Sequence, residues 1–218
     1  MLQLDDSVLL AKDCIKNLIK SWNNADHSIK GIGLNPIGRI FKPVSSIFQR
    51  LTLTNSNCEG IILSSGFAMG WNTHKKDFYS EWLNGGWVSW NLKKIRYLKK
   101  RKFPNIYWCV GEDVIMSLLN YTSKCYLISH KSKVSVLKKK RSNSMYKKFM
   151  EGYLHSKITH SYVRMFKRLS KTAFYYAILT SSILGAIKSI IRLNFKDTAR
   201  FFGRFLGMFT FFKTKNFR

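Results

Sequence analysis

The sequence predicts an α/β fold, because short apolar runs alternate with segments whose apolar residues have helical spacing. Residues 29–34 and 60–65 are expected to be short buried strands, and residues 125–129 and 133–137 two further strands. From Ser144 onward the spacing becomes helical. With 218 residues and 45% hydrophobic content, the chain can form one domain with a substantial core plus an appendage.

The first predicted element is an amphipathic helix near the N-terminus. Its apolar residues recur at spacings of three and four: Leu9, Leu10, Cys14, Ile15, Leu18, Ile19 and Trp22. Asp6 or Ser7 is the expected N-cap, because a side-chain oxygen there can accept a hydrogen bond from a free helix amide. Residues 31–38 are expected to form a turn-rich connection, since their glycines match neither a dinucleotide loop nor a phosphate loop.

The charge of the chain is extreme and uneven. The net charge is +27, and residues 114–218 carry 22 basic but only 2 acidic residues. Such a field suits partners that bear phosphate, either nucleic acid or an anionic membrane surface. The four cysteines are scattered without a C-x-x-C pair, which favours reduced thiols in a protein on the cytosolic side of a membrane.

Two adjacent carboxylates, Glu112 and Asp113, follow Gly111 at the predicted start of a helix. A helix N-terminus stabilises an anion by about 0.3–1 kcal/mol, so both side chains are expected to be ionised and able to accept a proton. Helix capping alone is the alternative role for such a pair.

Two further segments give this pair a context. Leu4-Asp5-Asp6-Ser7 lies near the N-terminus, and Gly85-Gly86-Trp87 lies upstream of Gly111-Glu112-Asp113. In this order, over residues 2–153, the segments resemble family 2 glycosyltransferases, which are inverting enzymes with the GT-A fold. The resemblance implies that residues 1–143 are the C-terminal part of a GT-A-like domain without its nucleotide-binding half. Residues 144–218 then form a basic, membrane-associated helical tail.

The resemblance also implies roles for individual residues. Asp113 would be the catalytic base, and Glu112 would position the acceptor, a glycan or a lipid-linked sugar. Asp5 and Asp6 would hold the nucleotide-sugar donor and a divalent cation, Mg²⁺ or Mn²⁺. Three residues would border the donor sugar: Gly85, Gly86 and Trp87.

Two departures from the family pattern concern the metal. Ser7 stands where the family has a third aspartate, which leaves Asp6 as the metal ligand of this segment, and a hydroxyl binds a hard cation poorly. Val136 stands where the family has a histidine, and His130 lies six residues too early. Together with the missing nucleotide-binding half, these departures imply an inactive enzyme or a split one completed by a separate chain.

Two segments of the tail bear on whether it associates with a membrane. Residues 173–187 are uncharged, but the run is shorter than the roughly 20 residues that span a bilayer. Residues 201–212 are rich in phenylalanine and flanked by cations, which is typical of a helix lying at a membrane surface. We expect a protein at the cytoplasmic face of the cell membrane, peripheral or single-pass. Helices packed on the domain itself are the alternative.

Two basic stretches, residues 93–102 and 138–141, suggest a different function. The first could bind RNA or DNA phosphates, and the second could pair with lipid phosphate or pyrophosphate. Solvated faces are the alternative for both. The alternative to a glycosyltransferase is therefore a basic, non-catalytic RNA-binding or ribosome-associated protein. No metal site is expected at His155 and His160, because their spacing of five does not place them on one helical face.

Overall fold

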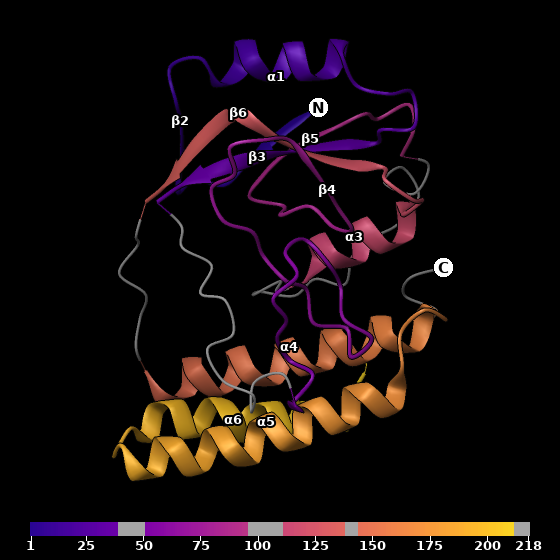
Figure 1. Cartoon of the computed structure of the whole chain (residues 1–218). Coiled ribbons are helices and arrows are strands. Elements are labelled where there is room, and N and C mark those ends of the chain that lie inside the picture. The colour runs from indigo at the N-terminus through magenta and orange to yellow at the C-terminus, as the bar shows by residue number, and fades with distance from the viewer. Residues whose placement is uncertain (39–50, 96–110, 138–143, 212–218) are drawn as a thin grey trace.

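The computed structural model describes residues 1–38, 51–95, 111–137 and 144–211. They form a mixed α/β structure in which helix α1 covers one face of a sheet, while α3 and then a layer of three long helices cover the other (Figure 1). The elements are β1 (Leu2–Leu4), β2 (Val8–Leu10), α1 (Cys14–Asn23), β3 (Gly31–Ile37), β4 (Phe78–Ser80), β5 (Trp87–Trp90), α3 (Glu112–Asn120), β6 (Tyr126–Val136), α4 (Met145–Met165), α5 (Lys171–Ile191) and α6 (Phe195–Gly207). The predicted α/β class is confirmed.

The sheet has the strand order β1-β5-β3-β6-β2, and β4 pairs with the start of β6. Among the strands that the structure describes, β3 and β6 pair in parallel and the other pairs are antiparallel. Strand β6 is continuous, where two separate strands were expected, because β3 pairs along most of its length. The register shifts once, after Leu34. At this point the side-chain amide of the buried Asn35 donates to the carbonyls of His74 (2.9 Å) and His130 (3.0 Å). The side-chain N–H groups of Asn35 are therefore paired, as buried donors usually are.

Alternate residues of the central strands enter two different cores, as a pleated strand requires. Ile32, Leu34 and Trp87 pack under α1 against Cys14 and Leu18. The opposite face carries a larger core, which includes Val88, Trp90, Tyr126 and Ile128. Two glycines of β3 lie on this second face, where a Cβ on Gly31 would come within 2.5 Å of Leu83 Cδ1 and one on Gly33 within 2.6 Å of Ile128 Cδ1.

Three sequence-based expectations for local structure are wrong. Residues 31–37 form β3, which confirms a strand where one was expected over residues 29–34 and contradicts the turn-rich connection expected over residues 31–38, because both edges of this segment pair with neighbouring strands. Helix α1 begins at Cys14, and its N-cap is Asp13, not Asp6 or Ser7, because Val8–Leu10 form a strand paired with β6. Residues 60–65 make a single bridge between Ile62 and Ala68 and no strand, although Ile62 is buried in the core.

Two of the three long helices, α4 and α6, pack with their backbones in contact. Helix α4 begins where the spacing predicts, with Ser144 Oγ accepting from the Lys147 amide at 3.2 Å. Glycines then bring the backbones of α4 and α6 into contact. A Cβ on Gly152 would overlap the carbonyl oxygen of Arg200, one on Gly203 that of Phe149, and one on Gly207 that of Tyr153. Small residues permit this kind of helix contact, which larger side chains would prevent.

The helical layer shares a core with the sheet. Ile158 and Tyr162 of α4, and Phe174 and Ile178 of α5, belong to the same buried cluster as Leu83 and the α3-facing strand residues. Among the described helices, α5 is long and apolar enough to cross a membrane, judged by length and composition alone.

Candidate functional site

Three segments that are far apart in the sequence meet at one end of β5. The antiparallel pairing of β1 with β5 places Leu4 opposite Trp87, so Asp5 follows beside the two glycines. The Asp5 amide donates to the Gly86 carbonyl at 2.8 Å. The Gly85 amide donates to Asp113 Oδ2 at 3.3 Å. The structure thus brings together four of the predicted site residues, Asp5, Gly85, Gly86 and Asp113.

The start of α3 holds the Asp113 carboxylate. Gly111 is the N-cap residue with φ of 109°, a left-handed conformation that glycine adopts at little cost. Asp113 Oδ1 accepts from the Val114 amide at 2.9 Å, while Oδ2 faces Gly85. Free amides and the dipole of a helix N-terminus favour the ionised form of a carboxylate. A half-buried carboxylate in this position can accept a proton from a bound hydroxyl group.

Ser117 fixes α3 against the glycine segment, a role that the sequence reasoning missed. Its buried hydroxyl donates to the Asp113 carbonyl at 2.7 Å and accepts from the Leu83 amide at 3.0 Å. The spacing of four residues indicates the contact with Asp113, one helical turn away, but not the contact with Leu83. Asn84 was missed as well, and its Oδ1 accepts from the Gly86 amide at 2.9 Å.

Gly85 and Gly86 have no side chains, so no side chain covers the backbone between the carboxylates of Asp5 and Asp113 at these two positions. A Cβ on Gly85 would lie 3.3 Å from Asp113 Cβ. A Cβ on Gly86 would lie 3.1 Å from Asn84 Oδ1 and 3.4 Å from Asp5 Cβ. Larger residues at these two positions would therefore crowd both carboxylates.

Asp5 also has a structural role. Its Oδ1 accepts from the Ser7 amide at 3.3 Å, and its carbonyl accepts from the Val8 amide at 3.1 Å, which closes the turn into β2. Asp6 is an exposed residue of the same turn. An aspartate in such a turn needs no ligand to explain it.

The remaining predicted residues lie elsewhere or are not described. The Trp87 side chain is buried in the core under α1, on the face of the sheet opposite α3. The side chain of Glu112 lies outside the described part of the structure. Trp87 therefore does not contribute to the geometry around Asp113.

The two departures from the glycosyltransferase pattern are neighbours in space. Val136 pairs with Val8, and the Leu137 amide donates to the Ser7 carbonyl at 2.8 Å. His130 lies farther back along β6, where its Nδ1 is 2.5 Å from Asp77 Oδ1. Within the described ranges, no three His, Cys, Asp or Glu side chains come close enough to hold a metal ion.

Asp113 lies close to the helical layer. A Cβ on Gly111, two residues before Asp113, would lie 3.4 Å from Ile158 Cγ2 and 3.8 Å from Tyr162 Cε1. Burial raises the pKa of the Tyr162 phenol, and the negative charge of Asp113 raises this pKa further. The Tyr162 hydroxyl donates to the Gly66 carbonyl at 2.5 Å. Tyr162 is therefore an uncharged side chain beside the carboxylate, and it does not act as a second acid or base at neutral pH.

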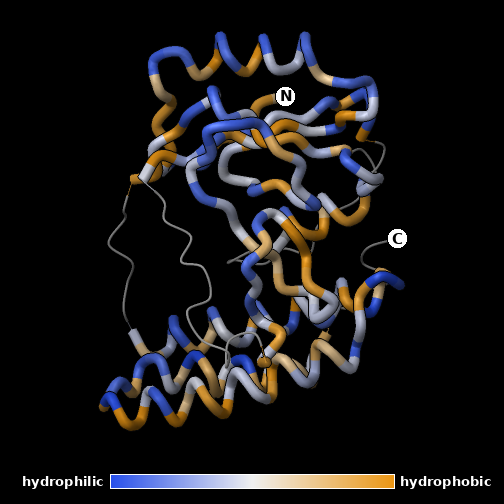
Figure 2. The backbone as a smooth tube through the Cα atoms, viewed as in Figure 1, coloured by the Kyte–Doolittle hydropathy of each residue, from blue (hydrophilic) through white to orange (hydrophobic). Residues whose placement is uncertain are grey.

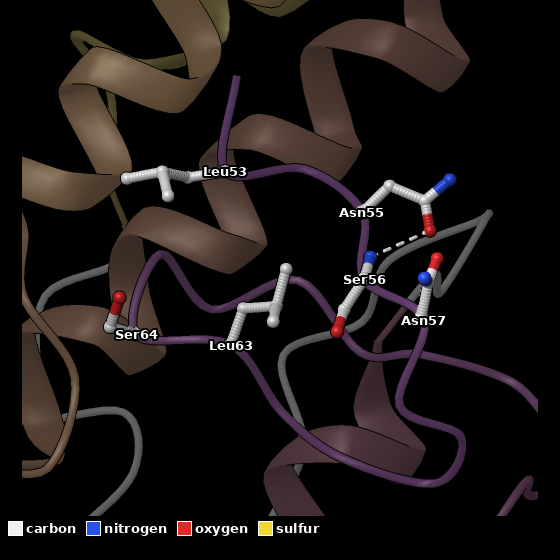
Figure 3. Close-up of a pocket in the computed structure, with 6 residues that line it drawn as sticks. All are labelled: Leu53, Asn55, Ser56, Asn57, Leu63 and Ser64. Carbon is white, nitrogen blue, oxygen red and sulfur yellow. Dashed lines mark hydrogen bonds between the residues drawn. The ribbon is translucent and has the colours of Figure 1, made fainter. Parts of the chain in front are cut away.

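A separate pocket lies in the loops before β4. It has a volume of about 300 Å³, and Figure 3 shows its lining residues, Leu53, Asn55, Ser56, Asn57, Leu63 and Ser64. None of them titrates near neutral pH, and none of the predicted site residues lines the pocket. The pocket is thus distinct from the carboxylate site.

Comparison with known proteins identifies no relative: no family model, no curated protein and no solved structure matches the chain.

Proposed function

We propose that this chain is part of an inverting glycosyltransferase with a GT-A-like fold, in which Asp113 is the catalytic base. The proposal is supported above all by the meeting of Asp5, Gly85 and Asp113 around one strand end. These residues come from the three segments that resemble family 2 glycosyltransferases. Segments so far apart in the sequence need not lie together in the fold, so their proximity supports a shared site.

In the proposed reaction, an acceptor hydroxyl attacks the anomeric carbon of a nucleotide sugar. The bond between that carbon and the diphosphate oxygen breaks, so the nucleoside diphosphate leaves and the configuration inverts. Asp113 takes the hydroxyl proton. Gly85 and Gly86 would let the donor sugar approach the backbone, and Asp5 and Asp6 would hold the donor and its divalent cation. That cation, Mg²⁺ or Mn²⁺, would offset the charge of the leaving diphosphate. Since Ser7 and Val136 supply no strong metal ligand, Asp6 and the diphosphate itself would have to hold it.

A nucleotide-binding half is proposed to pair with the open edge of β1. Strand β1 has three residues and pairs on one side only, with β5, among the strands that the structure describes. An unpaired strand edge is a template for another strand. Pairing along β1 would place the added half next to Asp5.

The acceptor is proposed to be a glycan or a lipid-linked sugar at the cytoplasmic face of the cell membrane. Helix α4 supports this location. Its Ile158 and Tyr162 adjoin the start of α3, and its Gly152 adjoins α6. Within the helical layer, α4 therefore contacts both the Asp113 segment and α6, and the same layer contains the apolar helix α5.

The test is a transfer assay on the tagged chain, purified from its own cells with any polypeptide bound to it. The complex is supplied with labelled nucleotide sugars, Mn²⁺ and a lipid extract. Asp113→Asn should lower transfer by roughly 10²–10⁴-fold, the usual scale for loss of a general base. Asp13→Asn is the matched control, because Asp13 lies at the start of α1 and its side chain makes no capping hydrogen bond. Unchanged turnover in Asp113→Asn would exclude the catalytic role.

A basic, non-catalytic RNA-binding or ribosome-associated protein is the second candidate, favoured by the net charge of +27. Most of the two basic stretches, residues 96–102 and 138–141, lies outside the described residues. Lys94 of the first stretch has a structural role, because its ammonium group donates to the carbonyls of His27 and Ile29. RNA that copurifies with an inactive complex and protects it from protease would support this candidate.

A further inference from the structure

Helix α5 exposes a continuous apolar face. Seven of its exposed large apolar residues recur at spacings of mostly three and four: Tyr176, Leu179, Ile183, Leu184, Ile187, Ile190 and Ile191. A stripe of this width normally packs against a protein core. Here it faces outward, and Figure 2 shows hydrophobic residues recurring along the outer turns of the helical layer.

Helix α6 carries a second apolar stripe beside the first. Three large residues at helical spacing on α6 are exposed, Phe195, Phe202 and Leu206, and the exposed Phe209 follows the helix in the next turn. The two helices touch, because a Cβ on Gly185 of α5 would overlap the Phe201 ring of α6. Exposed apolar surface of this extent marks an interaction site in a folded protein.

The opposite face of α5 is fixed to the rest of the protein. Phe174, Ala177 and Ile178 are fully buried in the main core. The Ser170 amide before α5 donates to the Ser64 carbonyl at 2.8 Å. A membrane-spanning α5 would have to withdraw these side chains from the core, so the structure favours a helix that lies along a surface.

The charges around this face select an anionic partner. Lys188, Arg192 and Lys196 are exposed near the turn between α5 and α6. Asp197, an acid in the first turn of α6, accepts from Asn194 Nδ2 at 2.7 Å and lies 3.9 Å from Arg200, which also pairs with Glu151 at 3.0 Å. Two copies of so basic a surface would repel each other, whereas acidic headgroups attract it.

We propose that α5 and α6 lie in the plane of an anionic phospholipid bilayer, with their shared apolar face inserted at the boundary between headgroups and acyl chains. The surrounding lysines and arginines contact lipid phosphates. This inference rests on the helical layer alone, and it holds whether or not the Asp113 site transfers sugar.

The experiment is sedimentation of the full chain with vesicles of phosphatidylcholine, with and without phosphatidylglycerol. We expect binding to the anionic vesicles that weakens as salt rises from about 0.1 to 0.5 M. Ile187→Ser with Phe202→Ser should lower the partition coefficient by about tenfold or more. The matched control is Ile15→Ser with Ile19→Ser on α1, across the sheet, since Ile19 is 55% exposed and Ile187 50%. The control should bind like the wild type.

Three results would overturn the proposal. One is the absence of binding to anionic vesicles at low salt. Another is bound protein that resists extraction at alkaline pH, because that indicates a spanning helix. The third is a dimer in sedimentation equilibrium without lipid that Ile187→Ser with Phe202→Ser dissociates, which would identify a second copy as the partner. Circular dichroism of each variant verifies the fold, which should persist because the substituted side chains are exposed.

Discussion

The Gly85 amide donates to Asp113 Oδ2 at 3.3 Å, which links the turn before β5 to the first turn of α3. A Cβ on Gly85 would lie 3.3 Å from Asp113 Cβ, so it would displace the carboxylate by a few tenths of an ångström. We expect Gly85→Ala to lower transfer by about tenfold or more, because catalysis depends on such positioning. The unfolding free energy should change by less than about 1.5 kcal/mol. Kinetics and urea denaturation of the same variant separate the two effects.

Ser117→Ala tests the other contact that positions α3. The substitution leaves the buried Leu83 amide without its acceptor, and an unsatisfied buried donor costs about 1–3 kcal/mol. Urea denaturation should show a loss of this size. Ser123→Ala is the control, because Ser123 is exposed in the turn after α3 and its loss should change stability by less than about 0.5 kcal/mol. An equal effect of the two substitutions would contradict the positioning role of Ser117.

Local patterns predicted the helices better than the first strands. The apolar spacing after Ser144 predicts α4, and the Ser144 cap confirms it. The same spacing rule fails at residues 8–10, which it assigns to a helix. Three residues carry too little periodicity to distinguish helix from strand, and pairing with β6, more than 120 residues later, decides the outcome.

The sequence motifs indicate several residues of the candidate site but not how these residues are arranged in space. Asp5, Gly85, Gly86 and Asp113 were chosen by motif, and the structure places them together. Trp87 belongs to the same motif, yet the strand alternation turns its side chain to the opposite face. Ser117 was missed because its second partner, the Leu83 amide, lies 34 residues earlier in the chain, a distance that helical spacing does not reveal.

Gly203→Ala should destabilise the helical layer. The new methyl group would overlap the Phe149 carbonyl oxygen, which belongs to the α4 backbone and cannot turn away. We expect a net loss of about 1–3 kcal/mol, although alanine favours a helix over glycine by about 1 kcal/mol. Gly185→Ala is the control, because it meets the partly exposed Phe201 ring, which can rotate. A smaller effect at Gly203 than at Gly185 in thermal unfolding would contradict the close backbone contact.

His155 should make the protein less stable in mild acid. Burial, together with the nearby positive charge of Arg204, lowers the pKa of His155 to about 3. In the unfolded chain a histidine titrates near pH 6.5, so the unfolded state binds one more proton than the folded state between these two values. The stabilising contribution of neutral His155 is therefore complete above pH 6.5 and is lost as the pH falls below it.

Between pH 7 and pH 5 this single group should lower the unfolding free energy by about 2 kcal/mol. Burial also lowers the pKa of His160, so this residue adds to the slope with the same sign. His155→Leu should remove about 2 kcal/mol from the difference between the two pH values, whatever its effect at pH 7. Urea denaturation at both pH values gives the four numbers, and an unaltered slope in His155→Leu would show that this imidazole is not buried in its neutral form.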